Sequence, residues 1–166
     1  MIVYFSKILI LGAISLPLAA QTLRVDFNEN ATTQNGWQSL SSGNSDLGDS
    51  WSKNFPGGVS LDVDAIGNIT LDNRDRSNNG GGGEASMWRD FLFAGGSFSS
   101  RPGSGLRLDF TGLQPNTEYP IKIWGYDASS TGGRAADWSG GGSEVQRLTF
   151  TSRPVTLADN VITLNV

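Results

Sequence analysis

Short runs in which apolar and polar residues alternate recur along most of the chain. Residues 106–110 read Leu-Arg-Leu-Asp-Phe, so an extended strand would place three apolar side chains on one face and two charged ones on the other. No apolar stripe with a period of 3.6 residues follows residue 21, and we therefore expect no helix. The predicted strands are residues 22–28, 58–63, 68–73, 88–94, 106–111, 118–127, 145–151 and 161–166.

The predicted strand 118–127 differs from the others because both of its faces are bulky. Tyr119, Ile121 and Ile123 fall on one face. The opposite face combines Lys122 with two aromatic residues, Trp124 and Tyr126. Such a strand is typical of a β-sandwich whose outer face is used or covered. Eight or nine short strands with glycine-rich punctuation thus predict an all-β chain folded as an antiparallel sandwich.

The first twenty residues have the order of a secretory signal peptide. Lys7 precedes an apolar run at 8–14, and the small residues Ala19 and Ala20 precede Gln21. The apolar run is shorter than the roughly 20 residues that a membrane-spanning helix needs. We therefore expect residues 1–20 to be removed and residues 21–166 to form one soluble domain, secreted or held at the cell surface.

Composition narrows the chemistry that this domain can perform. The chain has no histidine and no cysteine, which excludes histidine-based triads, most zinc sites, thiol nucleophiles and disulfides. Without Lys7, eleven basic residues stand against sixteen acidic ones, so a surface for nucleic acid or for an anionic membrane is not supported. The 22 glycines and the excess of Asp over Glu favour turns and loops.

Two segments, 74–86 and 128–143, are too long and too rich in glycine for simple hairpin loops. Loops of this length in a compact domain are usually either functional or disordered. Each carries paired charges and lies next to or contains a tryptophan, Trp88 and Trp138 respectively. These features favour a functional role, with the two loops converging at one end of the sandwich.

The tryptophans are candidates for binding a sugar, because an indole ring stacks on the apolar face of a pyranose. Trp138, between Asp137 and Ser139, is the best candidate for such stacking. An equally compatible alternative is that Trp138 folds back and closes the end of the sandwich. For Trp88, which precedes Arg89 and Asp90, a packed tryptophan beside a local ion pair is favoured over ligand contact.

Arg74, Asp75 and Arg76 form the densest group of charges. Planar guanidinium groups suit neighbouring hydroxyls or a sulfate ester, whereas a surface network of ion pairs would have no ligand role. The same group could hold the loops together by pairing with carboxylates elsewhere, at Asp90, Asp127 or Asp137.

Asp127 ends the aromatic strand and Arg134 follows seven residues later, so both are expected where the two loops meet. Near the first strand, Asp26, Asn28 and Glu29 offer the oxygen ligands that calcium prefers. Their spacing lacks the regularity of a calcium-binding loop. Calcium is therefore a possible structural ion and not a required cofactor.

Seven short motifs follow one another in the order Val25-Asp26-Phe27, Gly36-Trp37, Asn73-Arg74-Asp75-Arg76, Trp88-Arg89-Asp90-Phe91, Gly112-Leu113-Gln114-Pro115-Asn116-Thr117-Glu118-Tyr119, Trp124-Gly125-Tyr126-Asp127 and Ala136-Asp137-Trp138-Ser139. Taken together they resemble the galactose-binding-like β-sandwich modules of secreted bacterial proteins. The nearest likeness is to non-catalytic carbohydrate-binding modules attached to enzymes that degrade marine galactans such as agarose and porphyran.

The resemblance implies a jelly-roll-like antiparallel fold, polysaccharide binding without catalysis, a structural calcium and an attached glycoside hydrolase. It also implies a further strand after 156–166, so we expect the chain to be a piece of a longer polypeptide, and we expect a monomer. The expected ligand-binding residues are Trp138, Asp137, Arg76, Arg74, Asp75, Trp88, Arg89, Asp90, Asp127 and Arg134. Asp26 and Asn28 are the expected metal ligands.

Two other classes of function stay open. A small glycosidase needs two carboxylates at a set separation, and the chain offers acids without a motif that selects two of them, namely Glu84, Asp90, Asp127 and Asp137. A structural or adhesive surface module would use the glycine-rich loops for protein contacts and would bind no sugar. That second class predicts that Trp138→Ala is tolerated.

Overall fold

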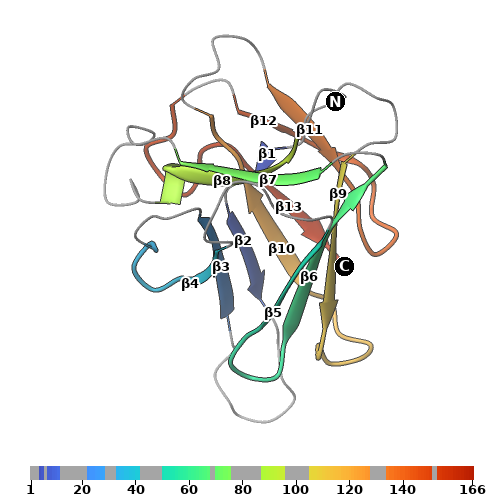
Figure 1. Cartoon of the computed structure of the whole chain (residues 1–166). Coiled ribbons are helices and arrows are strands. Elements are labelled where there is room, and N and C mark those ends of the chain that lie inside the picture. The colour runs from blue at the N-terminus through green and yellow to red at the C-terminus, as the bar shows by residue number, and fades with distance from the viewer. Residues whose placement is uncertain are drawn as a thin grey trace.

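The computed structural model describes residues 4–5, 7–11, 22–28, 33–41, 50–67, 70–75, 87–95, 105–127, 134–150 and 153–166, with the backbone alone for 4–5, 7–11, 41 and 94–95. Every extended element among these residues is a β-strand, and the only helical geometry in this part of the chain is a single 3₁₀ turn at Met87 and Trp88 (Figure 1). The all-β expectation is therefore confirmed. None of the described segments forms a helix long and apolar enough to cross a membrane.

The largest sheet has five strands in the order β13-β10-β2-β3-β4. All neighbours in it are antiparallel except β3 and β4, which are parallel. Its strands are β13 (Val161–Asn165), β10 (Pro120–Trp124), β2 (Lys7–Leu11), β3 (Thr22–Asn28) and β4 (Gln38–Ser41).

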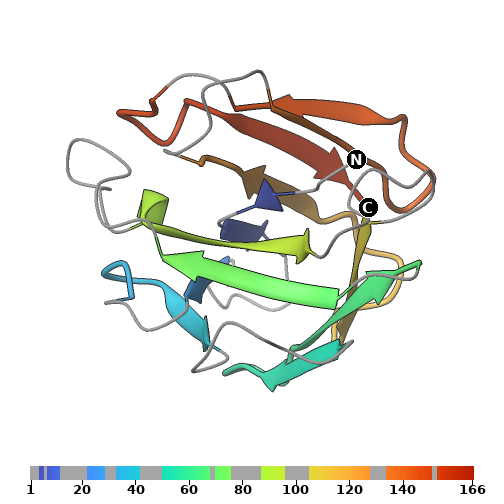
Figure 2. The same ribbon diagram turned by 45° about the horizontal axis from the view of Figure 1, so that its top comes forward.

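Three smaller antiparallel sheets complete the fold, in the orders β5-β6-β9, β1-β8-β7 and β11-β12. In Figure 2 the β11–β12 pair and β13 lie on one side of the molecule, and β5, β6 and β7 lie on the other. The strands are β5 (Ser50–Asn54), β6 (Ser60–Ile66), β9 (Gly105–Thr111), β1 (Tyr4–Phe5), β8 (Asp90–Gly95), β7 (Thr70–Asp75), β11 (Ala135–Trp138) and β12 (Gln146–Thr149).

One hydrophobic core joins the four sheets. Val25 of β3, Leu61 of β6, Leu71 of β7 and Leu148 of β12 are each at most 1% exposed and belong to the same packed cluster. Burial of a side chain of this size contributes about 1.5–3 kcal/mol. Because every sheet supplies residues to this core, no single sheet can bury its apolar face without the others.

A second cluster covers the outer face of β10. Trp124 and Tyr126 pack there with Trp37, Met87 and Trp88. The rings of Trp37 and Trp124 meet edge to face, with centroids 5.7 Å apart and planes at 74°. The Trp124 indole nitrogen donates a hydrogen bond of 3.0 Å to a backbone carbonyl at Leu157. The aromatic residues of the predicted outer face are thus buried, whereas Lys122 on the same face is half-buried.

Each of the eight predicted strands overlaps an observed one, and residues 22–28 coincide with β3. Trp88, the predicted start of a strand, lies instead in the turn before β8. β4, β5 and β11 were not predicted, and neither were β1 and β2, which lie in the segment predicted to be a signal peptide. β5 reads Ser-Trp-Ser-Lys-Asn and sits at the edge of its sheet, where one apolar residue suffices. β11 falls inside the predicted loop 128–143, and β7 includes Arg74 and Asp75 of the predicted loop 74–86.

The segment predicted to be a signal peptide contributes β2 to the middle of the five-stranded sheet. The backbone of β2 pairs with β10 on one side and with β3 on the other. Removal of residues 1–20 stays a prediction.

Candidate ligand-binding site

A cavity of about 540 Å³ opens between strands of different sheets. Its walls are mostly aliphatic and come from β9, β10 and β13, where they are formed by Leu106, Leu108, Phe110, Ile121, Ile123 and Leu164. Polar lining groups come from Arg107 of β9 and from Asp137 and Ser139 at the end of β11. The cavity is therefore lined by apolar side chains together with polar groups.

The alternation in β9 explains one wall of this cavity. Leu106, Leu108 and Phe110 point inward as the sequence predicts, but Leu108 and Phe110 are only half-buried. They line the cavity and at the same time pack at the margin of the main core. Arg107 and Asp109 on the other face are exposed, also as predicted.

Trp138 closes another wall. It is the last residue of β11, it is 8% exposed, and it packs with the main core while it lines the cavity. Of the two alternatives that the sequence left open, the structure has the packed indole and not one that stands out from a loop. A ligand in the cavity would meet the edge or face of the ring that borders the open space.

Asp137, beside Trp138, is held by Arg147, which no pattern in the sequence assigns to a site. The Arg147 guanidinium on β12 donates two hydrogen bonds of 2.7 Å to the Asp137 carboxylate. These bonds lower the pKa of Asp137 and raise that of Arg147. The two residues are register partners, so the pairing could have been found only if 135–138 had been recognised as a strand.

Arg107 is a second cavity residue that was not predicted as part of a site. Its guanidinium donates a hydrogen bond of 2.7 Å to Asp64 on β6 and lies 2.8 Å from the Asp109 carboxylate. The hydrogen bond to Asp64, followed by attraction to Asp109, raises the pKa of Arg107. Arg107 contributes to the lining of the cavity, but its side chain is 60% exposed and points to the face of β9 opposite Leu106 and Leu108.

The predicted charge group 74–76 lies elsewhere. Asp75 ends β7 opposite Asp90 in the β7–β8 ladder, and Arg89 donates hydrogen bonds of 2.8 and 2.7 Å to Asp75. These bonds raise the pKa of Arg89, and attraction to Asp75 and Asp90 acts in the same direction. Arg74 pairs instead with Asp72 at 3.6 Å, and its guanidinium lies 4.8 Å from the centre of the Phe93 ring.

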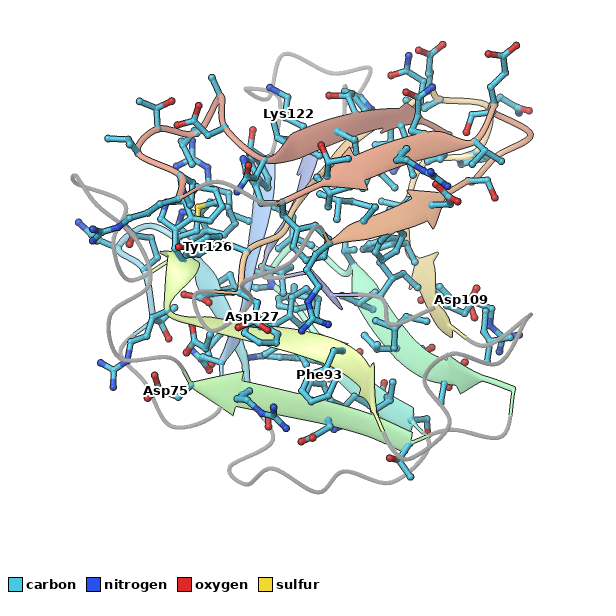
Figure 3. The ribbon with its side chains drawn as sticks, turned by 90° about the horizontal axis from the view of Figure 1, so that it is seen from above. Asp75, Phe93, Asp109, Lys122, Tyr126 and Asp127 are labelled. Carbon is cyan, nitrogen blue, oxygen red and sulfur yellow. The ribbon has the colours of Figure 1, made fainter. Side chains whose placement is uncertain are left out.

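The predicted site residues are therefore divided between two places. Asp137 and Trp138 line the cavity, whereas none of Arg74, Asp75 and Arg89 does. Figure 3 places Asp75 at one side of the molecule and Asp109, the neighbour of Arg107, at the other. Arg76 lies outside the described residues.

The remaining predicted ligand residues are buried or half-buried. Trp88 is fully buried in the second cluster, as favoured from the sequence, and Asp90 and Asp127 are 0% and 3% exposed. Figure 3 shows Asp127 toward the interior beside Tyr126. Arg134 is half-buried, and its carbonyl accepts a hydrogen bond of 3.1 Å from the Phe150 amide.

The side chains of Asp26 and Asn28 form hydrogen bonds with β4 and with the segment that leads into it. The backbone amide of Gln34 donates a hydrogen bond of 2.6 Å to the Asp26 carboxylate. The Ser39 hydroxyl donates one of 2.9 Å to the side-chain oxygen of Asn28. The Asn28 amide in turn donates to Thr33 at 3.0 Å. Within the described ranges, no three acidic residues gather in a way that could hold a metal ion, and Glu29 lies outside those ranges. Calcium binding at Asp26 and Asn28 stays a prediction.

The chain was compared with protein families, with curated proteins and with solved structures. No family, no curated protein and no solved structure matches it.

Proposed function

We propose that this chain is a jelly-roll-like β-sandwich of the galactose-binding-like type that binds a polysaccharide and performs no catalysis. Its ligand is a galactan of the agarose or porphyran class, and its role is to bring an attached glycoside hydrolase to that polymer. The order of the seven sequence motifs supports the family, and the cavity beside Trp138 is the observation that carries the binding.

The lining of the cavity matches the surface of a pyranose ring. A sugar offers an apolar C–H face and a rim of hydroxyls, and it is bound by apolar or aromatic walls with a few fixed polar groups. Trp138 and the aliphatic residues of β9 would contact the C–H face. The side chains of Arg107 and Asp137 lie on the strand faces opposite Leu108 and Trp138, so their charged groups would meet sugar hydroxyls at the rim of the cavity and not inside it. The volume of about 540 Å³ lies in the usual range for small-ligand sites.

The number of carboxylates at the cavity supports binding without hydrolysis. A glycosidase uses two carboxylic acids, of which one is protonated and the other ionised. Among the described lining residues only Asp137 carries a side-chain carboxylate, and it is engaged by the Arg147 hydrogen bonds. An acceptor for hydroxyl protons is the role that such a group can fill.

A structural or adhesive module is the second candidate, and a specific observation favours it. The charged groups that the sequence offered for a ligand are satisfied inside the chain, in the pairs Asp75–Arg89 and Asp137–Arg147. Trp138 is mostly buried. In this view the ion pairs stabilise ladder ends and the cavity is a packing defect with no ligand.

Affinity electrophoresis of the chain in gels containing agarose, porphyran, carrageenan, alginate, xylan or a β-glucan distinguishes the two. We expect retardation by agarose or porphyran and its loss in Arg107→Ala. Arg89→Ala is the matched control, because it also breaks an ion pair with an aspartate but lies outside the cavity lining. Free migration of the parent in every gel, with a folded circular dichroism spectrum, would reject polysaccharide binding and leave the structural module.

A further inference from the structure

The five-stranded sheet depends on a strand from the segment that the sequence predicts to be removed. β2 lies between β3 and β10 and is antiparallel to both (Figure 1). Its residues 7–11 belong to the predicted signal peptide, which would end at Ala20. One molecule cannot both lose this segment and keep it in the sheet.

Removal of β2 would leave two strand edges facing each other inside the sheet. Neighbouring strands lie about 4.8 Å apart, so β3 and β10 are separated by roughly 9.6 Å across the position of β2. Backbone hydrogen bonds of about 2.9 Å cannot cross that gap. The backbone groups of β3 and β10 that now pair with β2 would lose their partners, which is unfavourable in an interior.

The residues on either side of β2 define which strand fits. Ile8 occupies the register position between Val25 and Ile123, which are 0% and 1% exposed and belong to the main core. Ile10 holds the corresponding position between Leu23 and Ile121. The core side of this position thus calls for apolar residues at a spacing of two.

On the other face of the sheet, the first residue of β2 lies beside a charged group. Lys7 holds the register position between Asp26, a fully buried carboxylate, and Trp124, which is 2% exposed. Opposite charges at facing positions of a sheet stabilise the pairing, whereas like charges destabilise it. A basic residue followed by apolar residues at alternate positions is therefore the matching sequence.

We propose that β3 and β10 form a strand-acceptor site. The leader strand fills it in the unprocessed chain. After processing, an extended polypeptide segment with a basic residue and then apolar residues at alternate positions inserts antiparallel to both strands. This is β-strand addition within a sheet, in which the backbone supplies affinity and the register positions supply selectivity. The inference does not rest on carbohydrate binding, and either proposal can fail alone.

The test uses the full chain with residues 15–20 replaced by the recognition sequence of a site-specific protease, which is cut after folding. The probe is a fluorescein-labelled peptide of residues 5–13, followed by fluorescence anisotropy. We expect the peptide to bind the protein after the leader has been cut and washed out, to be displaced by its unlabelled form, and not to bind the uncut protein. A Leu9→Pro peptide should not bind, since proline lacks the amide that the ladder needs. A Lys7→Glu peptide should bind about two- to fivefold more weakly.

Hydrogen exchange supplies the second readout. Cutting and washing out the leader should expose the amides of β3 and β10 to exchange, and the added peptide should restore their protection. Amides that stay protected after the leader is gone would mean that β3 and β10 have closed on each other, and the acceptor site would be refuted. An exported protein whose N-terminal sequence still contains Lys7 would refute it as well, because β2 would then be a permanent strand.

Discussion

Asp137 and Arg147 face each other across the β11–β12 ladder, and the guanidinium donates two hydrogen bonds of 2.7 Å to the carboxylate. This geometry uses both oxygens of Asp137 and fixes the plane of the carboxylate beside the cavity. The pair joins the residue immediately before Trp138 to the neighbouring strand. The orientation of the polar side chain that precedes Trp138 thus depends on a residue ten positions away.

Loss of this pair should change the titration of Asp137. In Arg147→Ala the two hydrogen bonds disappear, and we expect the pKa of Asp137 to rise toward the ordinary value of a carboxyl group. Carboxyl ¹³C chemical shifts measured against pH report this change directly. Arg89→Ala should leave the Asp137 titration unchanged, since Arg89 pairs with Asp75. An unaltered Asp137 curve in Arg147→Ala would mean that the pair does not persist in solution.

Asp159 should make the free energy of unfolding depend on pH in the acid range. Its carboxylate accepts hydrogen bonds from the Val155 and Thr156 amides at 2.9 and 2.8 Å, which lower its pKa. A carboxyl group with a lowered folded-state pKa contributes stability that is present above its unfolded pKa of about 3.9 and is lost as pH falls through the folded value. The wild type should therefore exceed Asp159→Asn in its urea midpoint at pH 7, and the difference should shrink below about pH 4. A difference that is constant with pH would contradict this assignment.

Tyr119 should stabilise the turn before β10 through its hydroxyl. The phenolic oxygen accepts a hydrogen bond of 2.8 Å from the backbone amide of Gln114, and Tyr119 is 5% exposed. We expect Tyr119→Phe to reduce the free energy of unfolding by about 1 kcal/mol in urea denaturation. Thr117→Val is the control in the same turn, because its hydroxyl contact of 3.4 Å with Pro115 is exposed. Equal effects of the two changes would show that the Tyr119 bond contributes nothing specific.

Gly112 is required by a close approach of two turns. Its φ is +77°, and a Cβ atom there would overlap the carbonyl oxygen of Gly58 in the β5–β6 turn. Gly142 has φ of +80° but open space around a Cβ. We expect Gly142→Ala to cost about 1–2 kcal/mol for the backbone alone and Gly112→Ala to cost clearly more. Similar losses in thermal or urea unfolding would show that the two turns can move apart freely.

The stability of Trp138→Ala tests whether the Trp138 indole is packed or exposed. Trp138 is 8% exposed and packs with the main core, so its truncation should lower the free energy of unfolding by about 3–5 kcal/mol. Truncation of an indole exposed to solvent would change the free energy of unfolding by no more than about 0.5 kcal/mol. Denaturant unfolding of the variant against the parent decides between them. Because this substitution tests packing, the cavity residue Arg107 is the better probe of ligand binding.

Local patterns determined most of the strands and their faces. The alternation in residues 106–110 predicted which side chains of β9 turn inward, and the aromatic residues on the outer face of the predicted strand 118–127 were found buried. Strands with little alternation were missed. β5 has a single apolar residue and β11 only four residues in all, so neither stands out from a loop in a one-dimensional pattern.

The candidate site depended on contacts that a linear pattern does not contain. The sequence identified Trp138 and Asp137 but could not assign Arg147 or Arg107 to them, because the pairing requires the register of β11 with β12 and the meeting of separate sheets around the cavity. It also joined Arg74, Asp75 and Arg89 to the same site, whereas the fold puts them in another part of the molecule. Side-chain periodicity is set by neighbours along the chain, so the sequence alone determines which residues share a strand face. Burial and partnership are set by strands far apart in the chain that pack together, and only the tertiary structure decides them.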